Sequence, residues 1–148
     1  MTTNRNIGVS LAAVVDAAGA ENAVDASVDK AREAAELGLD AVWFGQRFDY
    51  DAIALAGFVG REVPGIAVGT SAVPIFGRHP LLVAAQARTS QAAAHGHFTL
   101  GLALGAPGSV ESVLGVPYER PIARLRDFLT VVRQVVETES ADFHGEIL

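Results

Sequence analysis

The stretch IAVGTSAVPIFGRHPLLVAAQARTSQAAAHGHFTLGLALG, residues 66–105, predicts a strand, a loop, a helix and a second strand. The first strand is expected at 66–73, an unbroken run of apolar and small residues that is typical of parallel strands buried on both faces. Pro80 favours a helix start, because proline lacks the N–H that the first helical turn leaves unbonded, and Gly96 favours its end. With the second strand at 98–104, this unit places two strands in one parallel sheet.

Two further units are expected around this stretch. Upstream strands are predicted at 7–13 and 39–44, and the helix between them begins near Asp25. A short helix capped by Asp51 is expected to run to Gly60. The first of these two helices is amphipathic, and its buried stripe is expected to consist of Val24, Val28, Ala31 and Ala35.

The segment after residue 105 contributes a long loop and a last helix. The loop is rich in Gly and Pro, with a short helix expected around 110–114, and the last helix is predicted at 121–138. The apolar residues expected on its buried face are Ile122, Leu125, Leu129, Val132 and Val136. The chain is therefore predicted to be a single α/β domain, 1–148, of four consecutive β/α units.

Four such units fit either an open doubly wound sheet or half of a (β/α)8 barrel, which typically needs about 250 residues. A doubly wound sheet that binds a dinucleotide carries G-x-G-x-x-G directly after its first strand. Here Val14, Val15 and Asp16 follow that strand, so the signature is absent. Periodicity alone leaves the choice between the two architectures open.

Composition narrows the function classes. With 148 residues, 50% hydrophobic and 19% charged, the chain is suited to a packed domain. A net charge of −6 with scattered Lys and Arg argues against nucleic-acid binding. The absence of cysteine excludes thiolate metal sites, and no histidine has a partner at metal-ligand spacing, so no metal is expected. No apolar run approaches the roughly 20 residues that span a bilayer, and we expect a cytoplasmic protein without a membrane partner.

Three segments resemble the luciferase-like monooxygenase superfamily, most closely its members that use coenzyme F420. They are WFGQRFDYDAIALAGFVGREVPGI (43–66), VGTSAVPIFGRHPLLVAAQARTSQAAAHGHFTLGL (68–102) and GVPYERPIARLRDFL (115–129). The resemblance implies the first four units of a (β/α)8 TIM barrel. It further implies that the four strands are parallel in the order 1-2-3-4, with helices on the outer side only.

The same resemblance implies a cofactor site on the third strand. Members carry a bulge there, with a non-prolyl cis peptide beside the middle ring of the flavin or deazaflavin, and it falls on Ser71–Ala72. The residues expected to bind the cofactor are Gly69, Thr70, Ser71, Ala72, Val73 and Gly105. Small residues let backbone approach a flat ring, although they would equally suit a crowded barrel interior. Coenzyme F420 is the expected cofactor, with FMN as the alternative.

Gln46 is the expected catalytic residue, in an orienting role. Relatives often place a His at the end of the second strand, where this chain has Gly45-Gln46-Arg47. An amide donates and accepts hydrogen bonds but does not shuttle a proton at neutral pH. At the end of the fourth strand, where relatives commonly offer an acid or a His, residues 104–107 carry no titratable group, so the sequence identifies no proton donor.

Two other motifs have two interpretations each. Arg78-His79-Pro80 could contact an anion at a helix N-terminus, or simply cap and anchor the helix. Trp43 and Phe44 are expected in the core, with the alternative that an aromatic edge lines the cofactor cleft.

The predicted function is hydride transfer between a reduced deazaflavin and a small organic substrate. The alternative is a catalytically silent half-barrel that serves as a binding or assembly module. Aldolase-like chemistry is discounted, because the single lysine, Lys30, lies on the wet face of an outer helix. Unpaired edges on the first and fourth strands, and open apolar inner faces, predict that the isolated chain is inactive and forms a homodimer or docks with the missing barrel half.

Overall fold

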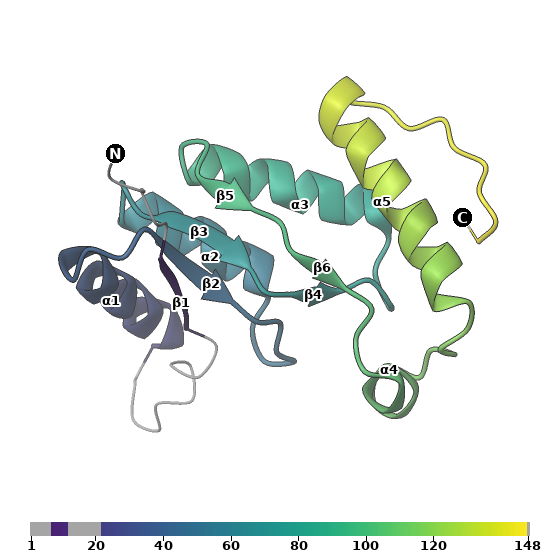
Figure 1. Ribbon diagram of the computed structural model, residues 1–148, viewed down its shortest axis with the longest axis horizontal. Coiled ribbons are helices and arrows are strands. Elements are labelled where there is room, and N and C mark those ends of the chain that lie inside the picture. Colours follow the sequence, from purple (N-terminus) through teal and green to yellow (C-terminus); the bar gives the residue numbers. More distant parts are fainter. Residues whose placement is uncertain (1–6, 12–21, 148) are drawn as a thin grey trace, which may run out of the picture.

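The computed structural model describes residues 7–11 and 22–147 (Figure 1). Its elements, in chain order, are β1 (Gly8–Ser10), α1 (Ala23–Glu36), β2 (Ala41–Phe44), α2 (Ala52–Glu62), β3 (Ala67–Thr70), β4 (Val73–Pro74), α3 (Pro80–Ala93), β5 (Phe98–Thr99), β6 (Leu102–Ala103), α4 (Pro107–Val113) and α5 (Pro121–Thr138).

The strands form two parallel sheets. The larger has the order β1-β2-β3-β5, and the smaller pairs β4 with β6. In the larger sheet, Trp43 lies opposite Ser10 on one side and Gly69 on the other, and Gly69 in turn lies opposite Thr99. The predicted parallel order of the four strand segments is confirmed.

The third and fourth strands are not continuous, and the prediction of single strands at 66–73 and 98–104 was wrong in this respect. Both strands break after their first part, which separates the larger sheet from the smaller one. At the break the side chain of Thr70 joins the two strands, since its Oγ1 donates to the carbonyl oxygen of Gly101 and accepts from its N–H, both at 2.9 Å. A hydroxyl thus takes the place of a ladder hydrogen bond. The first strand is also shorter than expected, and residues 12–13 lie outside the described residues.

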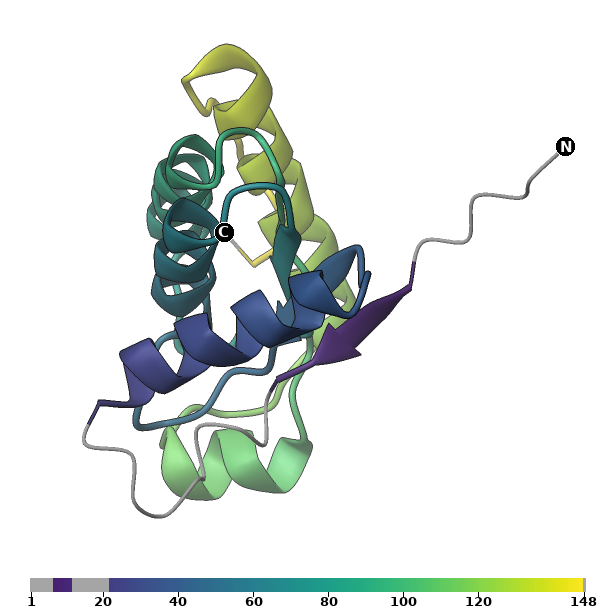
Figure 2. The same cartoon turned by 90° about the vertical axis from the view of Figure 1, so that its left-hand side faces the viewer.

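Helices α1, α2 and α3 lie on the same side of the larger sheet (Figure 2). Side chains alternate along β2, so that Val42 and Phe44 are at most 1% exposed beneath the helices, while Ala41 and Trp43 on the other face are only half-buried. Most residues of α2 are buried, since the helix packs against β2, β3 and α3, and its buried residues join those of the sheet and the other helices in one core.

Helix α1 begins two residues before the predicted start. The side-chain oxygen of Asn22 accepts from the N–H groups of Val24 (2.9 Å) and Asp25 (3.3 Å), which makes Asn22 the N-cap. The expected buried stripe holds at Val28 and Ala31, but it continues through Ala34 rather than Ala35, which is exposed. Spacings of three and four residues are both compatible with one helical face, so the sequence pattern does not distinguish them.

Helix α5 has the predicted bounds, but of the five residues expected on its buried face only Val132 is buried, while Leu125 is half-buried. Its buried residues are Asp127, Phe128, Val131 and Val132. Of the apolar residues expected to be buried, Ile122, Leu129 and Val136 are 62%, 40% and 51% exposed. The reason is that α5 packs mainly on α3, so that only part of its apolar surface has a neighbour.

Two predicted helix ends are also displaced. Helix α2 continues two residues beyond Gly60, and α3 ends at Ala93, before Gly96, which takes a φ of +91° in the following turn. No helix in the described part of the chain is long and apolar enough to cross a bilayer.

Candidate functional site

The break in the third strand lies at the carboxyl end of the larger sheet, next to the loop that follows β2. The peptide bond between Ser71 and Ala72 is cis, as the sequence resemblance predicted. Its two sides are tied to β2 and to the loop after β2. The Ser71 N–H donates to the carbonyl of Phe44 (2.8 Å), and the Gln46 N–H donates to the carbonyl of Ala72 (3.4 Å). The predicted neighbourhood of Gln46 and the cis peptide is thus present through the backbone.

Thr70 and Gly101 fix the shape of this break. Thr70 is 1% exposed, and its hydroxyl both donates to and accepts from the backbone of Gly101. At Gly101 an added Cβ would stand 2.0 Å from the Thr70 carbonyl oxygen, so no other residue fits there without moving the backbone. Sequence reasoning missed Gly101, although a glycine inside a strand often marks a close backbone approach.

The side chain of Gln46 is held inside its own loop. Its Nε2 donates to the carbonyl oxygens of Arg47 and Tyr50, the latter at 3.0 Å. Its Oε1 accepts from the Ala52 N–H (3.2 Å) and from an Arg78 Nη2 (2.9 Å). Two donor hydrogens and two lone pairs are all that an amide offers. Gln46 therefore anchors the loop at the start of α2, and its backbone rather than its amide faces the cis peptide.

Arg78 connects this loop to the helix that follows the smaller sheet. Its Nη2 donates to Asp51 Oδ2 at 2.9 Å, and Asp51 caps α2 through Oδ1, which accepts from the Ala54 N–H at 2.9 Å. His79 caps α3, since its Nδ1 accepts from the Leu81 N–H at 3.3 Å. Of the two interpretations of the Arg78-His79-Pro80 motif, the structure therefore supports capping and anchoring.

Val73 is the first residue of β4 in the smaller sheet, and Gly105 follows β6. The side chain of Val73 is fully buried, and its N–H donates to the Gly101 carbonyl at 2.9 Å. Gly105 has a φ of +78°, and a Cβ there would lie 3.3 Å from both Pro74 and Val110. Residues 69–73 thus lie where the two sheets meet, and Thr70 and Val73 contribute their side chains to the interior, whereas Gly105 lies beside Pro74 and Val110.

The polar side chains at the break, Thr70 and Gln46, carry no charge. On the exposed loop beyond them, Arg47 Nε donates to Asp49 Oδ1 at 3.0 Å, and this hydrogen bond lowers the pKa of the Asp49 carboxyl from its usual value. The described residues contain no group of three or more His, Asp or Glu side chains that could hold a metal. Chemically, the arrangement offers a backbone surface that can position a flat molecule.

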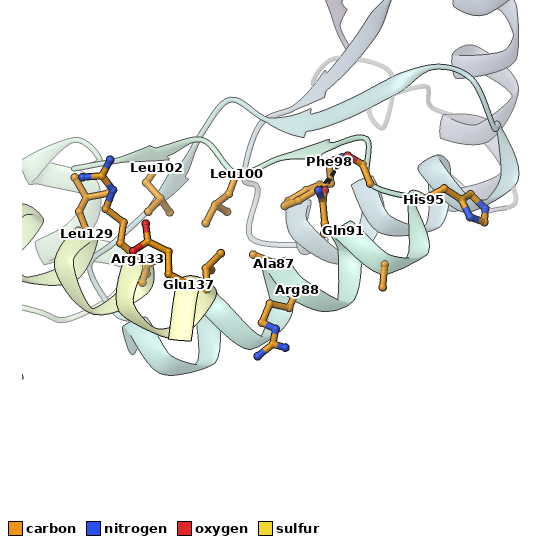
Figure 3. A pocket seen from close by; sticks show the side chains of 14 residues that line it. Ala87, Arg88, Gln91, His95, Phe98, Leu100, Leu102, Leu129, Arg133 and Glu137 are labelled. Atoms are coloured by element: carbon orange, nitrogen blue, oxygen red, sulfur yellow. Dashed lines mark hydrogen bonds between the residues drawn. The ribbon is translucent and has the colours of Figure 1, made fainter. Parts of the chain in front are cut away.

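Apart from the strand break, a groove lies on the helix side of the chain, between α3, α5 and the fourth strand (Figure 3). This α3–α5 groove has a volume of about 730 Å³. Its apolar lining comes from both helices and the strand, including Leu100, Leu102, Leu129, Val132 and Val136, and Arg88, Arg133 and Glu137 also line it. Beside the groove, β5 and β6 each form a terminal strand of their sheet, so their far edges pair with no other strand of the described chain.

Comparison with known proteins gives consistent matches. The family model of the luciferase-like monooxygenases matches residues 5–148. A protein of Mycobacterium tuberculosis named as a coenzyme F420-dependent oxidoreductase is 31% identical over 107 residues, which are 72% of this chain and 31% of that protein.

Solved structures share the fold. The monooxygenase RslO1 of Streptomyces bottropensis matches with a TM-score of 0.83 and 18% identity, over 97% of this chain and 46% of that one. The oxygenating constituent of 3,6-diketocamphane monooxygenase of Pseudomonas putida, in complex with FMN, has a TM-score of 0.79 and 15% identity. The coenzyme F420-dependent tetrahydromethanopterin reductase of Methanopyrus kandleri has a TM-score of 0.79 and 17% identity. Each of these two matches covers 95% of this chain and 42% of the other, so the chain spans less than half the length of these proteins.

Proposed function

We propose, from the premise that the chain belongs to the luciferase-like monooxygenase family, that it holds one face of a flavin-type ring in an oxidoreductase. The observation that carries this proposal is the backbone surface at the break between the two sheets. Ser71 and Ala72 place backbone there with only small side chains, next to Gln46, while Gly69 lies beneath the Trp43 indole and Gly101 against the Thr70 backbone. Parallel α/β folds bind ligands at the carboxyl ends of their strands.

The residues present fit such a ring. Ser71 and Ala72 would contact it and Gly105 would border it. Gly69, Thr70 and Val73, which are all buried, would hold the contacting backbone from behind. When bound, the cofactor supplies hydride transfer to or from a small organic substrate. The protein positions the ring and keeps water from one of its faces. Gln46 has an orienting role that it exerts through its backbone and the loop it anchors.

Coenzyme F420 is the proposed cofactor. It is supported by the name of the Mycobacterium tuberculosis relative, at 31% identity. FMN is the alternative, since a protein of the same fold is in complex with FMN.

We further propose that the chain forms the first four β/α units of a (β/α)8 barrel. Support comes from the parallel order β1-β2-β3-β5, from α1, α2 and α3 on one side of that sheet, and from the share of the solved structures that the chain matches. In this proposal the remaining units pair with β5 and β6 on one edge and with β1 on the other.

Titration of the purified chain with coenzyme F420 and with FMN, followed by the fluorescence of each cofactor, tests the proposed function. We expect saturable binding of at least one of them. Thr70→Val should abolish it, because the hydroxyl that closes the break is lost at nearly constant volume. Thr130→Val removes an exposed hydroxyl bonded to the Arg126 carbonyl on α5, and should bind as the wild type does. Failure of both cofactors to bind would refute the proposal.

A second candidate function is a catalytically silent binding or assembly module. It is supported by the α3–α5 groove, by the open edge of β5 and β6, and by the lack of charge on Thr70 and Gln46. Under both candidates we propose that the isolated chain is inactive and associates, as a homodimer or with the other barrel half. Light scattering should show a dimer or larger species. A monodisperse monomer would contradict association, and turnover by that monomer would contradict inactivity.

A further inference from the structure

Trp43 occupies the face of the larger sheet that α1, α2 and α3 leave open. Register places it among small residues on that face: Gly8, Ser10, Ala41, Ala67, Gly69 and Thr99. The indole is half-buried, whereas Val42 and Phe44 on the opposite face are at most 1% exposed. Trp43 therefore provides the one broad apolar side chain on the described part of this open face.

Two glycines make room for the indole on both sides. A Cβ on Gly69, in β3, would lie 2.5 Å from the indole Cζ3, and a Cβ on Gly8, in β1, would lie 2.8 Å from Nε1. The six-membered ring thus reaches toward β3, and the pyrrole N–H reaches toward β1. An indole that lies across three strands in this way presents a flat surface to the open side.

The six-membered ring of the Trp43 indole lies against β3, the strand that leads into the proposed ring site. Gly69 lies directly opposite Trp43 in the register, and Ser71 follows two residues later. Two residues of extended chain advance about 7 Å, which is within the width of one fused aromatic ring system. A flat ring against Ser71 and Ala72 would therefore extend over the indole.

We propose that Trp43 is a ligand-contacting residue that binds and orients the heteroaromatic ring of the cofactor, an inference that rests on the proposed function. Gly8 and Gly69 are required because they fix the position of the indole. An aromatic contact of this kind strengthens binding roughly 2- to 13-fold beyond simple burial. The other role open to Trp43 is to fill the interior without touching the cofactor.

The test compares dissociation constants of coenzyme F420 and FMN, measured by cofactor fluorescence, for the full 148-residue chain and four variants. Trp43→Leu should bind at least tenfold more weakly, and Trp43→Phe, which keeps an aromatic ring, should lose less than Trp43→Leu. Gly8→Ala should weaken binding several-fold. Its added methyl group, on β1, would collide with the pyrrole N–H side of the indole and displace the ring. Phe58→Leu, at an aromatic residue 59% exposed on α2, is the matched control and should bind as the wild type does.

Thermal unfolding of each variant separates misfolding from loss of contact. If Trp43→Leu does not fold, then Trp43→Phe and Gly8→Ala decide, and wild-type affinity in both would overturn the inference. Wild-type affinity in a folded Trp43→Leu would overturn it too, while leaving the proposed function intact. If the wild-type chain binds neither cofactor, the proposed function itself fails, and the role of Trp43 fails with it.

Discussion

The two sides of α3 are packed very differently. On the side of α2, Ile53 is fully buried, and an added Cβ on Gly60 would stand 2.5 Å from the Cβ of Ala94. The hydroxyl of Ser90 is buried there and donates to the Ile53 carbonyl at 2.8 Å. On the side of α5, the helices diverge around the α3–α5 groove, and Leu129 and Val136 stay 40% and 51% exposed.

The difference shows that an apolar stripe is buried only when neighbours exist on both of its sides. Helix α2 contacts α1, α3, β2 and β3, whereas the main partner of α5 is α3. The half-barrel proposal places the next β/α unit on the open side of α5. Mutations on the α2 side should therefore lower the stability of the fold. Mutations on the α5 side should instead weaken association with another chain.

The largest effect is expected for Ile53→Ala. This change truncates a fully buried side chain of α2, which should lower the free energy of unfolding by about 2–5 kcal/mol through lost burial and a residual cavity. Urea unfolding followed by circular dichroism measures it. Val136→Ala, on α5, is the matched control and should change stability by no more than about 0.5 kcal/mol. Equal losses in the two variants would contradict the comparison.

A smaller loss is expected for Gly60→Ala, in the contact between α2 and α3. The added methyl would overlap Ala94 and the Cγ2 of Val68, 2.5 and 2.9 Å away, and overpacking of this kind typically costs about 1–3 kcal/mol. Gly108→Ala, in α4, meets no atom within 4 Å and should be neutral or slightly stabilising. Chemical denaturation of both variants measures the difference, and a Gly60→Ala chain as stable as the wild type would show that the helices can move apart.

Leu129→Arg should leave stability almost unchanged, within about 0.5 kcal/mol, but should weaken association. The residue lines the α3–α5 groove and is 40% exposed, so a charge there is tolerated in the monomer and is costly once the groove is covered. Light scattering at several concentrations measures the shift toward monomer. Glu119→Arg, at an exposed residue outside the groove lining, is the control. If Leu129→Arg unfolded the chain, Leu129 would have to be part of the packed interior of the monomer, which would contradict this prediction.

The smallest effect is expected for Asp49→Asn, which lies outside both regions. Because its hydrogen bond from Arg47 lowers the pKa of Asp49 in the folded state, the ionised carboxylate adds stability above its unfolded pKa, near 3.8, and loses it as the pH falls below that value. The Asp49 side chain is exposed to solvent, so we expect thermal midpoints at pH 7 and pH 3 to match those of the wild type closely. A clear loss of stability at pH 7 alone would mean that this loop is part of the packed structure.

Much of the site could be predicted from the sequence, but not how its side chains are used. The small residues of 69–72 and the resemblance located the break in the third strand and its cis peptide. The bond between Thr70 and Gly101 joins residues 31 positions apart, and the link between Gln46 and Arg78 spans 32. No local pattern contains such pairs.

The kinds and order of the elements could be predicted from the local sequence, because these depend on short-range physics. Asp51 and Pro80 begin helices since their local chemistry suits a first turn, and apolar runs produced parallel strands in the predicted order. Only the tertiary structure decided which apolar face of α5 is buried, where the strands break, and that two glycines hold Trp43 across the open face. Periodicity defines a face of an element, whereas burial requires a neighbour, and neighbours are supplied by distant parts of the chain.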